Sequence, residues 1–241
     1  MKFTKQFTEF VETCKANNQY VGLGNPNAHI LIIGKEATPN EGFGPNALSW
    51  SALIDGVGTQ EFNLLEYVVD ENNKDHKKLY QGWGKNTWSK YQALIDKLRC
   101  KATRKYYVDF LTDVFATEMN NTQSETTQSA NKDSLATRKK MLKKSAFIKS
   151  FPVVILACSN YISNTGKMCE IDEMFDVSYD GDDKGKYIYN SSNWFYTHHN
   201  ADRTTLVIHT RQLSADVKNE MLDEMADIIR LHLANTQKLE L

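Results

Sequence analysis

Residues 204–215, TTLVIHTRQLSA, decide the fold of this chain. Residues 206–208 form a short apolar run that is typical of a buried strand, and the run stops at His209. Ser214 is a good helix-capping residue, so we expect a helix to begin at Asp216. A strand, a short loop and a capped helix are typical of open α/β folds, in which ligands bind beyond the carboxyl ends of parallel strands.

Three further apolar runs predict the strands beside this one: HILIIG at 29–34, DVFAT at 113–117 and FPVVILA at 151–157. Residues 186–197 are expected to be extended, after a turn at 180–183. Apolar residues at helical spacing predict helices at 3–16, 62–80, 86–99, 137–151 and 214–234. A further helix is expected around Trp50, after the glycine-rich loop. Because no linker divides the chain, we predict one domain over residues 1–241. It should be a three-layer α/β/α sandwich around a central, mainly parallel sheet of four strands.

The composition is that of an ordinary globular protein, with 41% hydrophobic and 24% charged residues and a net charge of −1. This charge gives no general attraction for nucleic acids, although one basic face can coexist with an acidic one. No apolar run has membrane-spanning length, and the N-terminus lacks the apolar core of a signal peptide. The four cysteines are scattered, which favours free thiols and argues against a zinc or iron–sulfur site. We therefore expect a cytoplasmic monomer without a metal or other cofactor.

Two segments are candidates for ligand contacts. The glycine-rich loop at 40–46 follows the strand that ends at Gly34, and its glycines would let the backbone approach a ligand closely. The helix at 137–151 is basic and is the best candidate for a surface that contacts phosphates, through Arg138, Lys139, Lys140, Lys143 and Lys144. The alternatives are a simple turn and a solvated helix face. The adjacent His198 and His199 do not predict a metal site, because neighbours on a strand point to opposite faces.

Four segments in order resemble the uracil-DNA glycosylase superfamily. Residues 209–215, HTRQLSA, resemble the H-P-S-P-L-S-A segment of that family. ILIIG followed by KEATP resembles its first motif, DVFATE lies where the family has a strand ending in Asn, and FPVVILACSN resembles its third strand. The resemblance spans most of residues 29–220 and implies a divergent member that acts in DNA repair.

The resemblance implies a chemistry for these positions. Cleavage of an N-glycosidic bond proceeds through an oxocarbenium-like sugar, and the departing base gains negative charge on O2. His209 would donate a hydrogen bond to that oxygen, and Glu36 would position the attacking water. Phe43 would stack on a base flipped out of the duplex, while Gly34 and Asn46 would line the pocket. Leu213 corresponds to the family's leucine that enters the duplex.

The same loop also suggests contacts with the DNA backbone. Arg211 and Ser214 lie beside Leu213 and would contact DNA, with a solvated side chain as the alternative for Arg211. For His209 the alternative is a structural hydrogen bond at the end of the strand. For Glu36 it is a surface salt bridge with Lys35 or another cation.

The chain departs from the family at the residue that reads the base. Glu118 stands where the family has Asn, and an ionised carboxylate only accepts hydrogen bonds, whereas an amide also donates them. Glu118 would therefore need a proton to face a uracil, or Asn120 would take its place. In addition, Thr210 and Arg211 replace the Pro and Ser of the family's last motif.

These observations leave three functional hypotheses. The first is a DNA N-glycosylase that removes uracil or another deaminated or damaged base, with His209 and Glu36 in one pocket and Leu213 exposed at its rim. The second is an inactive protein of the same fold that binds a nucleobase, a nucleotide, a nucleic acid or a protein partner. The third is an unrelated doubly wound α/β enzyme, although the chain lacks the G-x-G-x-x-G and P-loop motifs of nucleotide-binding proteins.

Overall fold

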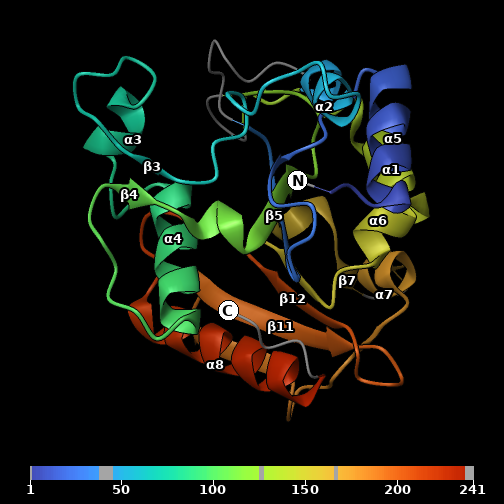
Figure 1. Ribbon diagram of the computed structural model, residues 1–241. Coiled ribbons are helices and arrows are strands. Elements are labelled where there is room, and N and C mark those ends of the chain that lie inside the picture. Colours follow the sequence, from blue (N-terminus) through green and yellow to red (C-terminus); the bar gives the residue numbers. More distant parts are fainter. Residues whose placement is uncertain (1, 38–45, 125–127, 166–167, 237–241) are drawn as a thin grey trace.

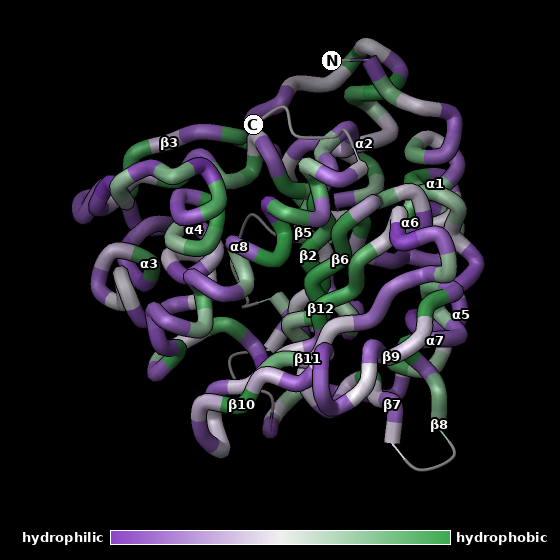
Figure 2. Tube along the Cα trace, turned by 90° about the horizontal axis from the view of Figure 1, so that it is seen from below, coloured by the Kyte–Doolittle hydropathy of each residue, from purple (hydrophilic) through white to green (hydrophobic). Residues whose placement is uncertain are grey.

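A computed structural model describes residues 2–37, 46–124, 128–165 and 168–236. Within these ranges the chain folds around a mixed sheet of eight strands, with the order β1-β5-β2-β6-β12-β11-β10, and β9 pairs with β11 (Figures 1 and 2). The α/β class is confirmed. The sheet is larger than the four-stranded one predicted and is mixed.

The middle of the sheet consists of the apolar runs that the sequence marks. Four strands, β2 (Ile30–Gly34), β5 (Val114–Glu118), β6 (Val153–Leu156) and β12 (Leu206–Thr210), pair in parallel with one another. Every residue of β2, β6 and β12 is buried, as expected of strands covered on both faces. Figure 2 shows the hydrophobic colouring concentrated along these strands.

The remaining strands are antiparallel or lie outside the main sheet. β1 (Leu23–Gly24) pairs with β5, and the edge beyond β12 consists of β11 (Asn193–His199), β10 (Lys186–Asn190) and β9 (Ser178–Tyr179). The segment 186–197, predicted as one extended piece, therefore folds back on itself between β10 and β11. Two small ribbons complete the strands: β3 (Tyr67–Val68) with β4 (Tyr107–Val108), and β7 (Asn164–Thr165) with β8 (Met168–Cys169).

Helices pack on both faces of the sheet. One apolar core joins the helices α4 (Thr87–Leu98) and α8 (Asn219–Asn235) to the sheet. The opposite core joins α1 (Lys5–Ala16), α2 (Ala47–Ile54), α5 (Leu135–Lys144), α6 (Ala146–Lys149) and α7 (Glu170–Phe175) to its other face (Figure 1). The helices predicted at 3–16 and 86–99 are confirmed, with Thr4 and Asn86 as side-chain N-caps.

Three predicted helices differ from the structure. Only α3 (Lys77–Gln81) of the stretch 62–80 is helical, because Asp70 and Asn73 bind backbone N–H groups two residues ahead and so favour turns. The helix predicted at 137–151 is broken at Ser145, whose extended backbone and side chain cap α6. The last helix begins at Asn219 and not near Ser214, because Ala215 has a φ of 50° and binds the Lys85 carbonyl through its N–H.

Two short 3-10 helices interrupt the connections: η1 (Phe110–Thr112) before β5 and η2 (Ser159–Tyr161) after β6. No helix among the described residues is long and apolar enough to cross a membrane. All four cysteines are free, with Cys14 and Cys158 buried and Cys100 and Cys169 exposed.

Candidate functional site

The strand order places the candidate site at the carboxyl ends of the parallel strands. The first of these strands in the sequence, β2, lies between β5 and β6, so the chain moves to one side of β2 and then to the other. Such a reversal opens a crevice beyond the strand ends, where ligands bind in open α/β sheets. The segments that follow β2, β5, β6 and β12 meet there, and they include most of the residues predicted for the site.

Glu36 lies in a cluster with Tyr161, Asn120 and Glu118, which we call the acid cluster. The Tyr161 hydroxyl donates a hydrogen bond of 2.5 Å to Glu36 Oε2, and the Glu36 residue is only 8% exposed. Asn120 also hydrogen-bonds to Tyr161, and it donates through Nδ2 to the Asn131 carbonyl. Burial, together with the neighbouring Glu36, raises the pKa of Tyr161, so its hydroxyl keeps its proton and remains a donor.

Glu118 is a carboxyl group that burial keeps protonated. Burial, and then the negative charge of Glu36, raises its pKa to about 8, while the Arg138 guanidinium acts in the opposite direction. Glu118 Oε2 is buried and has no hydrogen-bond partner among the described residues. Gly34 lies directly beside it: a Cβ on Gly34 would come within 2.3 Å of Oε2. At neutral pH this carboxyl can therefore both donate and accept hydrogen bonds, as an amide does.

Arg138 hydrogen-bonds to the strand that carries Glu118, and the sequence did not predict this role. It is fully buried, donates to the Glu118 carbonyl and to Thr117 Oγ1, and lies 4.0 Å from the Cys14 sulfur. Arg138 was predicted to belong to a basic surface for phosphates. Its spacing from Leu135 and Leu142 on the same helix would have placed it on the inward face.

The side-chain amide of Asn46 is used in hydrogen bonds to the backbone. Its Oδ1 accepts from the N–H groups of Val21 and Gly22, and its Nδ2 donates to the Gly22 carbonyl. Because both ends of the amide are used, Asn46 holds the segment before β1 in place. Phe43 lies outside the described residues.

His209 and Glu36 are both tied to η2, at residues two positions apart. His209 Nε2 lies 3.0 Å from the Ser159 carbonyl oxygen, which only accepts, so Nε2 carries the proton and donates. Ser159 has a φ of 49°, which residues other than glycine rarely adopt. Burial lowers the pKa of His209 to about 4, so the imidazole is neutral at pH 7 and its single N–H is used by Ser159.

A hollow lined by aromatic rings opens beside His209, and we call it the aromatic cavity. Its volume is about 600 Å³. Tyr196 pairs with His209 across the strands, and the ring centroids of Trp194 and His209 are 5.3 Å apart. Its lining also includes Tyr179, Ile188, Asn160, Asn164 and Asn190. His209 lines this cavity but Glu36 and Glu118 do not, so the two expected catalytic residues, His209 and Glu36, do not share it.

The loop after β12 differs from the prediction. Leu213 has no exposed surface and belongs to the apolar core, so it does not stand at a rim. It is buried because the loop turns inward before α8 begins at Asn219, three residues later than the predicted start at Asp216. Ser214 caps no helix, and Arg211 Nη1 donates to the Ser192 carbonyl.

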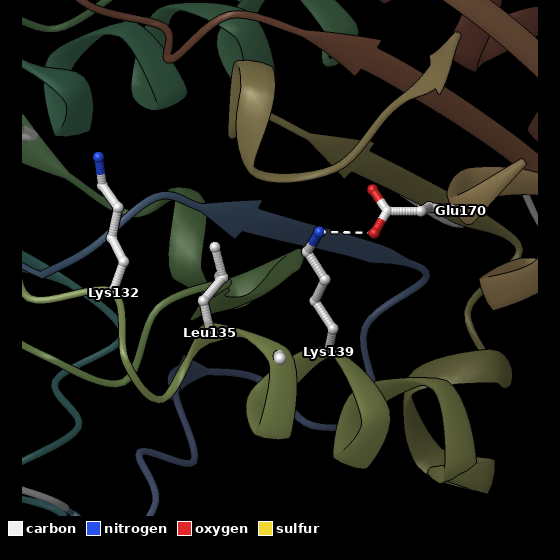
Figure 3. A pocket seen from close by; sticks show the side chains of 5 residues that line it. Lys132, Leu135, Lys139 and Glu170 are labelled. Atoms are coloured by element: carbon white, nitrogen blue, oxygen red, sulfur yellow. Dashed lines mark hydrogen bonds and ion pairs between the residues drawn. The ribbon is translucent and has the colours of Figure 1, made fainter. Parts of the chain in front are cut away.

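Figure 3 shows a second, smaller pocket, which lies beside α5. It has a volume of about 400 Å³ and contains the ion pair of Lys139 with Glu170, 2.7 Å apart. Lys132 and Lys35 point toward the ring of Tyr161, with Nζ atoms 5.6 and 5.4 Å from its centroid. The predicted basic helix is thus partly neutralised by α7, since Lys143 also pairs with Glu173.

A metal site is not apparent in the part of the chain that is described, where no three His, Cys, Asp or Glu residues are grouped to hold an ion. His198 and His199 point to different partners, Asp172 and Asp180 respectively. No family model matches the chain, and no curated protein matches it.

Proposed function

We propose that this protein hydrolyses the N-glycosidic bond of a deaminated or damaged base in DNA, with the acid cluster as its centre. The observation that supports the proposal is the meeting of Glu36, Tyr161, Asn120 and a protonated Glu118 at the carboxyl ends of parallel strands. These groups provide a carboxylate for water and donors and acceptors for a base edge. The resemblance of the surrounding segments to uracil-DNA glycosylases supports the same assignment.

In this proposal the acid cluster divides the chemistry between its members. Glu36 accepts a proton from water as the water oxygen bonds to C1′ and the bond between C1′ and the base nitrogen breaks. The electron pair of the broken bond leaves with the base, which is then protonated from solvent. Glu118 donates a hydrogen bond to a carbonyl of the base, and Asn120 hydrogen-bonds to the same edge of the base. Together they replace the Asn that reads the base in the family.

His209 has a different role from the one predicted. Its only N–H is donated to Ser159, so it stabilises charge on O2 of the base only if the base oxygen replaces the Ser159 carbonyl. We therefore assign the chemical step to Glu36 and place His209 in the lining of the aromatic cavity, bonded to η2.

A second candidate function is binding of a nucleobase without hydrolysis. The burial of Leu213 favours it, because no described residue of that loop then serves as an apolar wedge that opens a duplex. The use of the His209 N–H by Ser159 also favours it, because a donor at O2 is the main stabilising group in the catalytic scheme.

An abasic-site assay separates the two candidates. The protein is incubated with single- and double-stranded oligonucleotides carrying uracil, hypoxanthine or oxidised bases, and the products are treated with alkali to cut at abasic sites. Glycosylase activity predicts strand cuts at one of these bases. Glu36→Gln should lower the rate about 100-fold or more, because it removes a general base.

Glu173→Gln is the matched control, since Glu173 is exposed and forms an ion pair with Lys143 rather than with a member of the acid cluster. It should leave the rate unchanged. The absence of cuts at every base, with a protein that is folded by circular dichroism, would reject hydrolysis and leave the binding function.

A further inference from the structure

The aromatic cavity has no part in the hydrolysis proposed above, and its lining is rich in aromatic rings. Trp194, Tyr196 and Tyr179 come from two strands, and His209 forms the inner wall. The ring centroids of Trp194 and Tyr196 are 5.4 Å apart, and those of Tyr179 and Tyr196 are 5.9 Å apart. Ring faces at these positions provide stacking surfaces for a planar ligand.

The inner wall offers a hydrogen-bond acceptor. His209 is 9% exposed, and its Nε2 donates to the Ser159 carbonyl. The neutral ring therefore has a bare Nδ1, which has no hydrogen bond within the described residues. A ligand that reaches this nitrogen must bring an N–H group.

The rest of the lining offers hydrogen-bond donors. Asn164 Oδ1 accepts from the N–H groups of Ile171 and Asp172, and Asn190 Oδ1 accepts from Ser192 and Asn193. Their Nδ2 groups have no partner within the described residues. The Asn160 amide is likewise without a partner in that part of the chain, and all three residues line the cavity.

The charges around the cavity are balanced. Its one lysine, Lys186, pairs with Asp182 at 2.7 Å, and both residues lie at the exposed edge. The other lining carries no carboxylate or lysine. The cavity thus suits a neutral, planar ring with an N–H donor beside carbonyl or ring-nitrogen acceptors.

We propose that the aromatic cavity binds a nucleobase, stacked on Trp194 and Tyr196 with its N–H directed at His209 Nδ1 and its acceptors at the asparagine amides. An indole ring fits the stacking surface, but its N–H only donates, so it lacks the acceptors that these amides require. The proposal does not rest on hydrolysis at the acid cluster, because the cavity would bind a base in an active or an inactive protein.

Tryptophan fluorescence tests the proposal, with uridine and a short oligo(dT) as the probes. Trp194 is partly exposed in the cavity, whereas Trp50 is completely buried, so stacking of a base should quench the emission of Trp194 selectively. Trp194→Phe should abolish the quenching while calorimetry still detects binding, because the ring face remains. Trp83→Phe is the control and should leave the quenching intact.

Two further variants test the contacts. Tyr196→Leu removes a stacking face and should weaken binding at least about fivefold, whereas Tyr196→Phe should bind like the original protein. His209→Leu removes the acceptor and should also weaken binding about fivefold or more. Circular dichroism and urea unfolding confirm that each variant is folded before it is compared.

Quenching by uridine supports a site for a single base, and quenching by oligo(dT) alone supports a base held as part of a strand. No quenching by either probe would overturn the proposal. So would quenching that persists in Trp194→Phe, or equal binding of indole and uridine. A protein that quenches but cuts no oligonucleotide keeps this inference, and one that cuts without quenching loses this inference alone.

Discussion

The acid cluster and the aromatic cavity both include residues of η2, Tyr161 in the first and Ser159 and Asn160 in the second, and burial removes the charge of one group in each. Burial keeps Glu118 protonated and His209 unprotonated, so an acid and a base are both neutral at pH 7. The protonated Glu118 therefore lowers the free energy of unfolding as the pH rises, and the unprotonated His209 lowers it as the pH falls. The protein should therefore be most stable at a pH between these two limits.

The largest expected effect is that of Glu118→Gln at alkaline pH. The folded pKa of Glu118 is about 8 and its ordinary value is 4.5, so the folded state holds a proton that the unfolded chain releases above pH 4.5. Stability is therefore fully present below pH 4.5 and is lost as the pH rises toward 8, by on the order of 4 kcal/mol. Glu118→Gln should remove this loss and unfold at higher urea than the original protein at pH 8.

The control for this variant is Glu173→Gln, which replaces an exposed carboxylate. Urea unfolding of both variants is measured at pH 5, 6, 7 and 8. Parallel stability curves for Glu118→Gln and the original protein would show that Glu118 is ionised in the folded state, and would remove the base-reading role from the acid cluster.

The second effect concerns Leu213, in the loop that follows β12 and His209. Leu213 is fully buried in the apolar core, so Leu213→Ala should lower the free energy of unfolding by about 3 kcal/mol. A leucine that serves as an exposed wedge would instead leave stability unchanged and weaken only DNA binding. Urea unfolding and a DNA-binding titration on the same variant distinguish these roles, with exposed Leu48→Ala as the control for leucine removal.

The central strands could be predicted from the sequence because their signal is local. Runs such as ILIIG and VVIL predict buried strands by themselves, because a strand covered on both faces needs apolar residues at every position. The same holds for α4, with its Asn86 cap and its apolar stripe. The helix prediction for residues 62–80 was wrong because Asp and Asn side chains there stabilise turns, although the apolar residues have helical spacing.

The candidate site could be predicted only in part, because its contacts join distant segments. Glu36 and His209 stand out beside strand ends, but Tyr161 is 125 residues from Glu36 and no motif marks it. Arg138 was assigned to the surface because lysines surround it in the sequence, although its spacing placed it inward. The burial of Leu213 depends on where α8 begins, which the capping rule at Ser214 placed wrongly.

The third effect is the loss of stability at acid pH that His209 should cause. The folded pKa of His209 is about 4 and its ordinary value is 6.5, so the unfolded chain binds a proton that the folded protein excludes in this range. Stability should fall as the pH falls below 6.5, by roughly 2 kcal/mol at pH 5. His209→Gln should remove that part of the fall.

His198 and His232 also have pKa values lowered by burial, so some acid sensitivity should remain in His209→Gln. The measurement is urea unfolding at pH 5, 6 and 7, with His29→Gln as the control for the loss of a histidine. If His209→Gln and the original protein lose equal stability between pH 7 and 5, His209 is protonated in the folded state and does not offer a bare Nδ1.

The smallest effect should come from the stacking surface itself, which contributes binding area and little to folding. Trp194 is partly exposed and faces the cavity, so Trp194→Ala should lower the free energy of unfolding by only about 1 kcal/mol, equally at pH 5 and pH 8. Its neighbour Phe195 points to the opposite face of β11 and is fully buried, so Phe195→Ala should cost about 3 to 5 kcal/mol. Both are measured by urea unfolding followed by circular dichroism, because one variant lacks a tryptophan. A large cost for Trp194→Ala would mean that its ring is a structural wall and that the hollow beside it is incidental. A small cost that does not change with pH fits a ring whose contact area is kept for a ligand.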